Sequence, residues 1–292
     1  MSGTTPSRTT VTGVGGTRLR ALSWTPRTPR GRVLVVHGLG EHAGRYDLLA
    51  KALGRRGYAL LAYDLRGHGE SEGRQGHVDA FDLFVEDLAA VHRAVPDLIA
   101  GPGLPFLYGH SMGGLVLLRY LQTRRPAAPG VVLSAPWMAT AAAIPRWKEL
   151  LAMVLRRVAP SFPVPTDLTP EDLTRDGERQ RRYLEDPLVG HRISVALYDA
   201  VLEAQRLALD AGLPDYPTLL LLPGDDRVAD GRTVKRWVEA AGEGVRTVAL
   251  PGFRHEPHND VGREDVFALM ADWLDDRAGE APDLPGGQNP LE

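Results

Sequence analysis

The chain has 292 residues, of which 43% are hydrophobic and 24% are charged, and its formal net charge is −3 at pH 7. This length suits one large globular domain or one domain with an insertion, and the small negative charge excludes the basic surface that nucleic-acid binding needs. The chain has no cysteine, which excludes disulfides, a thiol nucleophile and thiolate metal sites.

The start of the chain, MSGTTPSRTT, lacks the apolar core of a signal peptide. No run of residues approaches the roughly 18 apolar positions that a membrane-spanning helix needs. We therefore expect a cytoplasmic protein.

The pattern of the chain predicts strands that alternate with helices. Two short strands are expected within residues 8–24, as a hairpin around a glycine-rich turn. Further strands are expected at Val33–Val36, Tyr58–Tyr63, Leu104–Tyr108, Val131–Leu133, Thr218–Leu222 and Val245–Leu250, and helices at 45–55, 79–99, 112–124, 231–241 and 263–277. Such alternation predicts an α/β fold with a mostly parallel, eight-stranded sheet covered by helices on both faces.

The alternation stops between residues 137 and 205, a stretch rich in helix formers and prolines with no convincing strand. We expect this stretch to be a helical cap insertion between two core parts, 1–136 and 206–278, and we expect 279–292 to be a flexible tail. Within the cap, 144–158 is amphipathic, with Trp147 and Leu151 on its apolar face. That face permits two interpretations, transient contact with a lipid interface or packing onto the core.

The sequence Gly-His-Ser-Met-Gly-Gly at 109–114 joins a predicted strand to a predicted helix. One interpretation is architectural, because glycines let a strand turn sharply into a helix. The other is chemical, because a G-x-S-x-G turn exposes a strained serine as a nucleophile at the end of a sheet. The chemical interpretation makes Ser111 a nucleophile and requires a base, an acid and oxyanion donors elsewhere in the chain.

Two later strand ends supply the acid and the base in the order that this topology requires, serine, then acid, then histidine. Asp225 and Asp226 follow the strand at 218–222, and His255 follows the strand at 245–250. The pattern alone does not choose between the two aspartates. Each residue also has a structural interpretation, since aspartates after strands often cap helices and most histidines are surface or packed residues. His258 and His191 are competing histidines, and His255 is preferred because it directly follows the strand.

Two backbone N–H groups are expected to form the oxyanion hole. One belongs to Met112, which follows Ser111 and opens a helix whose dipole adds to the effect. The other is expected from the loop His37-Gly38-Leu39-Gly40 after the strand at 33–36, with Leu39 as the donor. The alternative is that this loop is an ordinary glycine-rich turn.

Over about residues 10–278, the chain resembles the monoacylglycerol lipase and lysophospholipase-like branch of the α/β-hydrolase superfamily. HGLGEHAGRY (37–46), YDLRGHGESEG (63–73), GHSMGG (109–114), GDDRVAD (224–230) and GFRHEPHND (252–260) are similar to its signatures in order. The resemblance implies Asp226 as the acid. It also implies that Arg45 and His110 frame the polar end of the site, where they hold glycerol or the oxyanion loop. The alternative is that Arg45 only pairs with Glu41.

The resemblance implies a serine ester hydrolase that cleaves monoacylglycerols, or similar medium- to long-chain esters, without a metal or organic cofactor. A lysophospholipase, a general carboxylesterase or a peptidase would use the same residues and differ in the cap. A non-catalytic binding protein on the same scaffold is a third hypothesis, against which the intact Ser111, Asp226 and His255 argue. The sequence predicts a small lipid ester as partner and does not indicate an oligomeric state.

Overall fold

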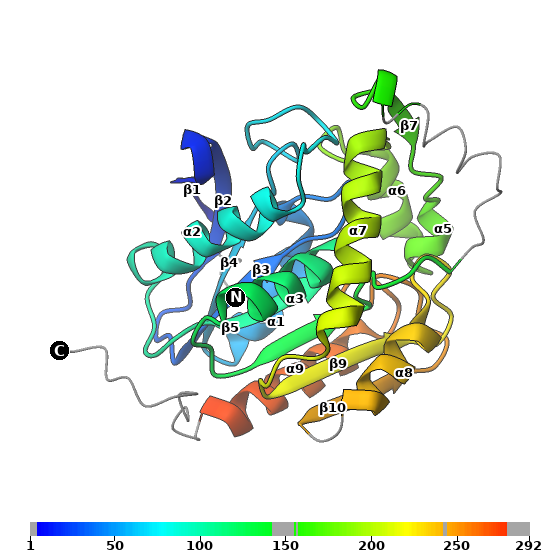
Figure 1. Cartoon of the computed structure of the whole chain (residues 1–292). Coiled ribbons are helices and arrows are strands. Elements are labelled where there is room, and N and C mark those ends of the chain that lie inside the picture. The colour runs from blue at the N-terminus through cyan, green and yellow to red at the C-terminus, as the bar shows by residue number, and fades with distance from the viewer. Residues whose placement is uncertain (1–4, 142–154, 156, 242–243, 279–292) are drawn as a thin grey trace.

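An eight-stranded sheet forms the centre of the computed structural model, which describes residues 5–141, 155, 157–241 and 244–278 (Figure 1). Its strands are β1 (Ser7–Thr12), β2 (Arg18–Trp24), β3 (Gly31–Val36), β4 (Tyr58–Tyr63), β5 (Phe106–His110), β6 (Val131–Ser134), β9 (Thr218–Pro223) and β10 (Val245–Leu250). They lie in the order β1-β2-β4-β3-β5-β6-β9-β10. Strand β2 is antiparallel to both neighbours, and the remaining neighbours pair in parallel. The predicted mostly parallel, eight-stranded sheet is confirmed.

Both faces of this sheet are buried. Alternate residues of a strand point to opposite faces, so neighbouring residues belong to different core clusters. In β3, Leu34 and Val36 belong to one core cluster, whereas Val33 and Val35 belong to the other. The first cluster packs under α2 (Asp82–Leu98), α3 (Met112–Arg124), α7 (Val195–Ala211) and α8 (Gly231–Ala241), and the second under α1 (Asp47–Arg55) and α9 (Arg263–Ala278). Helix α3 lies beside both α2 and α7 (Figure 1). Because the parallel strands run in the same direction, the loops that follow them lie at one edge of the sheet.

The chain between β6 and α7 contains β7 (Pro163–Pro165), α5 (Pro170–Leu173), α6 (Gly177–Glu185) and β8 (Arg192–Ser194), which lie together at the upper right of Figure 1. Strands β7 and β8 pair antiparallel, so the expectation of no strand in 137–205 is wrong. The pair escapes sequence reasoning because each strand has three residues and two of those in β7 are prolines, which cannot donate a ladder hydrogen bond.

Helix α7 continues unbroken through residue 205 to Ala211, and the division of the chain into core parts and cap stays a prediction. The predicted helix at 144–158 falls almost entirely outside the described residues, as does the predicted tail at 279–292. No helix within the described ranges is long and apolar enough to cross a bilayer.

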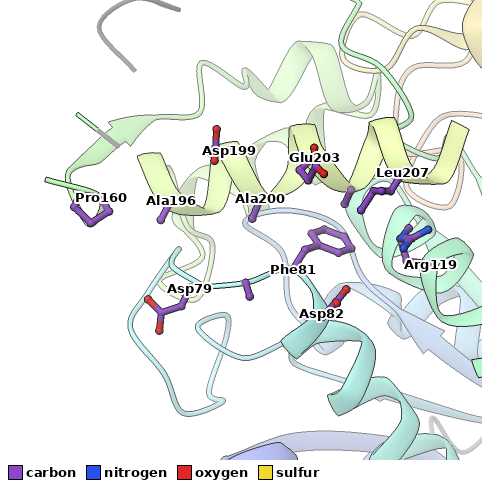
Figure 2. A pocket seen from close by; sticks show the side chains of 12 residues that line it. Asp79, Phe81, Asp82, Arg119, Pro160, Ala196, Asp199, Ala200, Glu203 and Leu207 are labelled. Carbon is purple, nitrogen blue, oxygen red and sulfur yellow. The ribbon is translucent and has the colours of Figure 1, made fainter. Parts of the chain in front are cut away.

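A hollow of about 410 Å³ lies beside α7 (Figure 2). One wall is formed by α7 and the other by the segment 79–82 at the start of α2. Its lining includes the acidic side chains of Asp79, Asp82, Asp199 and Glu203. Apolar side chains, among them Phe81 and Leu207, make up the rest of the lining together with Arg119, and none of the predicted site residues lies on it.

Candidate active site

Ser111 occupies the sharp turn between β5 and α3. Its backbone has φ 53° and ψ −121°, a conformation that non-glycine residues rarely adopt and that costs about 1–3 kcal/mol. Three backbone hydrogen bonds hold the turn: Ser111 N–H donates to the carbonyl of Ser134 at 3.0 Å, and the Ser111 carbonyl accepts from Trp137 at 3.0 Å and Leu115 at 3.2 Å. The strained turn is thus fixed by β6 and by the first turn of α3.

The glycines of the motif are required by close packing around this turn. A Cβ on Gly113 would lie 2.2 Å from the carbonyl oxygen of Val36 and 2.3 Å from that of His37, so α3 packs directly against the end of β3. A Cβ on Gly109 would lie 2.7 Å from the Gly113 carbonyl. A side chain at Gly113 would push the serine turn away from the end of β3, and one at Gly109 would push β5 away from α3.

The structure brings Ser111, His255 and Asp226 into one hydrogen-bonded chain. Nε2 of His255 lies 2.8 Å from Oγ of Ser111, and Nδ1 of His255 lies 3.0 and 2.9 Å from the two carboxylate oxygens of Asp226. An ionised carboxylate only accepts, so Nδ1 carries the proton and Nε2 accepts from the serine hydroxyl. The backbone N–H groups of Val228 and Ala229 donate to Asp226 Oδ1 at 2.8 and 2.9 Å and fix its orientation.

Burial and the neighbouring carboxylate act on His255 in opposite directions. Desolvation alone would lower the pKa of the imidazole, but the charge and hydrogen bond of Asp226 outweigh it and raise the pKa above its ordinary value of 6.5. The carboxylate therefore stabilises the imidazolium that forms when the ring takes a proton.

The other acid and histidine candidates lie elsewhere. Asp225 is half-exposed and its carboxylate lies 2.6 Å from Nη1 of Arg254. The His258 ring stacks on Tyr46 at 4.6 Å between centroids, and desolvation by burial lowers its pKa to about 3. His191 lies between α6 and β8, with its ring beside that of Tyr183. Of the two aspartates, the geometry selects Asp226.

The loop after β3 lies directly against Ser111. A Cβ on Gly38 would lie 3.1 Å from Cβ of Ser111. His37 fixes this loop, because its Nε2 accepts from the backbone N–H of Leu65 at 2.9 Å and its Nδ1 lies 2.8 Å from the Gly38 carbonyl. Leu39 follows Gly38 with its side chain against the first core cluster, and Met112 is the first residue of α3, where backbone N–H groups have no intrahelical acceptor.

Arg45 and His110 lie in a buried polar cluster behind His255. Nη2 of Arg45 donates to both carboxylate oxygens of Glu256 at 2.7 and 2.6 Å, and Nε lies 3.5 Å from Oε2 of Glu41. Nδ1 of His110 lies 3.1 Å from the Ser134 carbonyl, and its Nε2 lies 3.5 Å from Oε1 of Glu41. Arg45 therefore forms its hydrogen-bonded ion pair with Glu256 and lies beside Glu41, and sequence reasoning missed Glu256.

The two glutamates of this cluster titrate in opposite directions. Burial and the nearby charge of Glu256 together raise the pKa of Glu41 to about 8, so Glu41 is largely protonated at pH 7. Burial would also raise the pKa of Glu256, but the Arg45 guanidinium outweighs it and lowers that pKa. Glu256 therefore carries the negative charge opposite Arg45.

Comparisons with known proteins identify the family of this chain. Residues 27–262 match the family described as serine aminopeptidase, S33. The monoacylglycerol lipase of Mycolicibacterium smegmatis is 32% identical over 281 residues, which cover 94% of this chain and 99% of that one, and phospholipase YtpA of Bacillus subtilis is 30% identical, covering 87% and 98%.

Among solved structures, a monoacylglycerol lipase of Paleococcus ferrophilus superimposes with a TM-score of 0.79 at 32% identity, covering 89% of this chain and 99% of that chain. The resemblance stated from the sequence motifs is thereby confirmed. The chain belongs to the serine aminopeptidase S33 family of α/β-hydrolases and to its monoacylglycerol lipase-like branch.

Proposed function

We propose that this protein hydrolyses monoacylglycerols to a fatty acid and glycerol through an acyl-enzyme on Ser111. The observation that carries the proposal is the 2.8 Å contact between Ser111 Oγ and His255 Nε2, with Asp226 on the opposite ring nitrogen. The substrate class is supported by relatives of this length that are named monoacylglycerol lipases.

In the first half-reaction, Ser111 Oγ attacks the ester carbonyl carbon while its proton passes to Nε2 of His255. The backbone N–H groups of Leu39 and Met112 donate to the oxygen that becomes negative in the tetrahedral intermediate. The intermediate collapses as the bond to the glycerol oxygen breaks, and the imidazolium gives its proton to that oxygen. Asp226 keeps the imidazole in the required tautomer throughout.

In the second half-reaction, water attacks the acyl carbonyl and gives a proton to His255. Collapse of the second tetrahedral intermediate returns that proton to Ser111 Oγ and releases the fatty acid. In both half-reactions the groups that the protein contributes are side chains and backbone N–H groups, and water is the second nucleophile.

We assign Arg45 and His110 to support of the oxyanion loop. Both side chains are buried, and Arg45 joins the segment after that loop to the residue following His255. This support does not require either side chain to contact glycerol.

Lysophospholipids are the second candidate substrates, because one relative is a phospholipase of similar length. Transient contact of the cap with a lipid surface remains part of the proposal, although most of the predicted amphipathic face falls outside the described residues. A cytoplasmic location likewise remains a prediction.

The test is a panel of p-nitrophenyl esters of two to sixteen carbons, 1-monolauroylglycerol, a triglyceride and a lysophosphatidylcholine, each with the wild type and Ser111→Ala. We expect the monoacylglycerol to be cleaved best and Ser111→Ala to be inactive on every substrate. Hydrolysis of short esters alone would reduce the proposal to a general carboxylesterase. Activity of Ser111→Ala at the wild-type level would reject Ser111 as the nucleophile.

A further inference from the structure

The backbone around His255 is held by the cap. The backbone N–H of Glu256 donates to the carbonyl of Leu173 at 2.9 Å, and that of His255 donates to the carbonyl of Asp172 at 3.4 Å. Both acceptors belong to α5. Two successive N–H groups of the histidine loop therefore end on the cap rather than on the core.

Asp260 extends this pairing through its side chain. Its Oδ2 accepts from the backbone N–H of Arg254 at 2.7 Å, and its Oδ1 accepts from the backbone N–H of Arg175 at 2.7 Å and from Oγ1 of Thr174 at 3.3 Å. Its side chain is 0% exposed. One buried carboxylate thus joins the residue before His255 to the two residues that follow α5.

Arg175 adds a further link between the same two segments. Its Nε lies 3.0 Å from Oδ2 of Asp260, and its guanidinium carbon lies 5.2 Å from the centre of the Phe253 ring, two residues before His255. Charge-assisted hydrogen bonds of this kind are shorter and stronger than neutral ones. The two oxygens of a carboxylate are rigidly connected, so a displacement of either segment is passed to the other.

We propose that the cap segment Asp172–Arg175 sets the position of His255 and that Asp260 is the positioning residue that couples them. This inference rests on the proposed function, because that function makes His255 the base. Its consequence is that the cap acts on the chemical step as well as on access to the site. Asp260 touches neither Ser111 nor the imidazole, so its effect passes through the backbone of Arg254.

The test is Asp260→Asn, assayed with p-nitrophenyl butyrate, with active sites counted by titration with a fluorophosphonate. Counting sites removes the effect of any unfolded fraction. Asparagine turns an N–H₂ group either toward the backbone N–H of Arg254 or toward those of Arg175 and Val261, and either clash displaces the loop. We expect kcat per titrated site to fall about 10- to 100-fold with KM nearly unchanged, since a misplacement of about 1 Å costs on the order of 10²-fold.

The matched control is Asp176→Asn. Asp176 also joins cap to core, through Arg263 at 2.7 Å, and caps α6 by accepting from Glu178 and Arg179. Asparagine caps helices as well as aspartate does, so this variant loses only the core contact. We expect its kcat per titrated site to equal that of the wild type. Wild-type kcat in Asp260→Asn, or an equal loss in Asp176→Asn, would overturn the inference.

Arg175→Gln keeps the test decisive if Asp260→Asn does not fold. Its side chain is partly exposed, so we expect the substitution to be tolerated; it removes the side-chain contacts with Asp260 and Phe253, while the backbone N–H of Arg175 still donates to Asp260. We expect a smaller fall in kcat in the same direction, and an unchanged kcat would count against the coupling. Failure of the proposed function would look different, because wild type would then not cleave the ester or Ser111→Ala would still cleave it.

Discussion

Arg45 and Glu256 form a buried ion pair in which one guanidinium nitrogen lies 2.7 and 2.6 Å from the two carboxylate oxygens. Arg45 follows the proposed oxyanion loop, and Glu256 follows the proposed base. The pair therefore holds two parts of the site together that are far apart in the sequence. Because Glu256 balances the charge of Arg45, Glu41 can stay protonated at neutral pH.

Glu256→Gln is expected to destabilise the fold at pH 7 by about 3 kcal/mol. Removing one partner of a buried pair leaves the other charge uncompensated, which costs about 3–5 kcal/mol, and ionisation of Glu41 at 3.5 Å offsets part of that cost. Urea unfolding measures the change. The matched control is Glu41→Gln, which is expected to be tolerated at pH 7, and equal destabilisation by both variants would contradict the assigned charges.

The raised pKa of Glu41 should make a measurable contribution to the pH dependence of the free energy of unfolding. Its pKa is about 8 in the folded protein and near 4.5 when unfolded, so between these values the folded state holds a proton that the unfolded state has lost. This term makes the free energy of unfolding fall as pH rises through that window. The advantage of Glu41→Gln over wild type should therefore grow from pH 5 to pH 8 in urea titrations, and a constant difference would reject the raised pKa.

Asp226→Asn is expected to lower kcat on the order of 10⁴-fold, because an amide can hold His255 in the wrong tautomer. Asp225→Asn removes a half-exposed carboxylate paired with Arg254 and should leave kcat within about twofold of wild type. Steady-state kinetics on p-nitrophenyl butyrate compares the two. The reverse order of effects would move the acid to Asp225.

The pH profile of kcat/KM should report the raised pKa of His255. The imidazole acts as a base only when neutral, so activity should fall as pH falls through a midpoint above 6.5. In Asp226→Asn, the midpoint of the residual activity should move to lower pH. Burial lowers the pKa of the His255 ring, and the carboxylate that opposes this effect is then absent. A midpoint that stays in place in Asp226→Asn would exclude Asp226 as the cause.

Gly113→Ala is expected to destabilise the protein by about 1–3 kcal/mol and to lower kcat. The added Cβ would overlap the carbonyls of Val36 and His37, and overpacking of this kind outweighs the roughly 1 kcal/mol that alanine gains over glycine in a helix. Gly54→Ala is the control, because Gly54 lies in α1 with open space around its Cβ position. It should be neutral or stabilising by thermal unfolding.

Much of the sheet was predictable because its strands are buried on both faces and read as continuous apolar runs. The predicted strand Tyr58–Tyr63 has the observed bounds of β4. The predicted strand at Leu104 begins instead at Phe106, since Pro105 cannot donate a ladder hydrogen bond and Leu104 is exposed. Local pattern thus located the strands, and backbone chemistry moved their ends.

The site was predictable where chemistry dictates residue type and order along the chain. Ser111, Asp226 and His255 lie in contact as expected, although their catalytic roles stay predictions. Glu256 and Asp260 were missed because their partners come from distant segments, and acidic residues at such positions have no periodicity. Only the three-dimensional arrangement shows that a surface-type residue is buried and paired.

The sheet is interrupted in sequence but not in space, because β6 ends at Ser134 and its neighbour β9 begins at Thr218. The entropic penalty of closing a chain excursion grows only with the logarithm of its length, by about 0.6 kcal/mol for each doubling. A longer or shorter excursion here would leave the strand pairing intact at little thermodynamic cost. The sheet should therefore tolerate replacement of this segment, provided that the contacts at Asp172–Arg175 are kept.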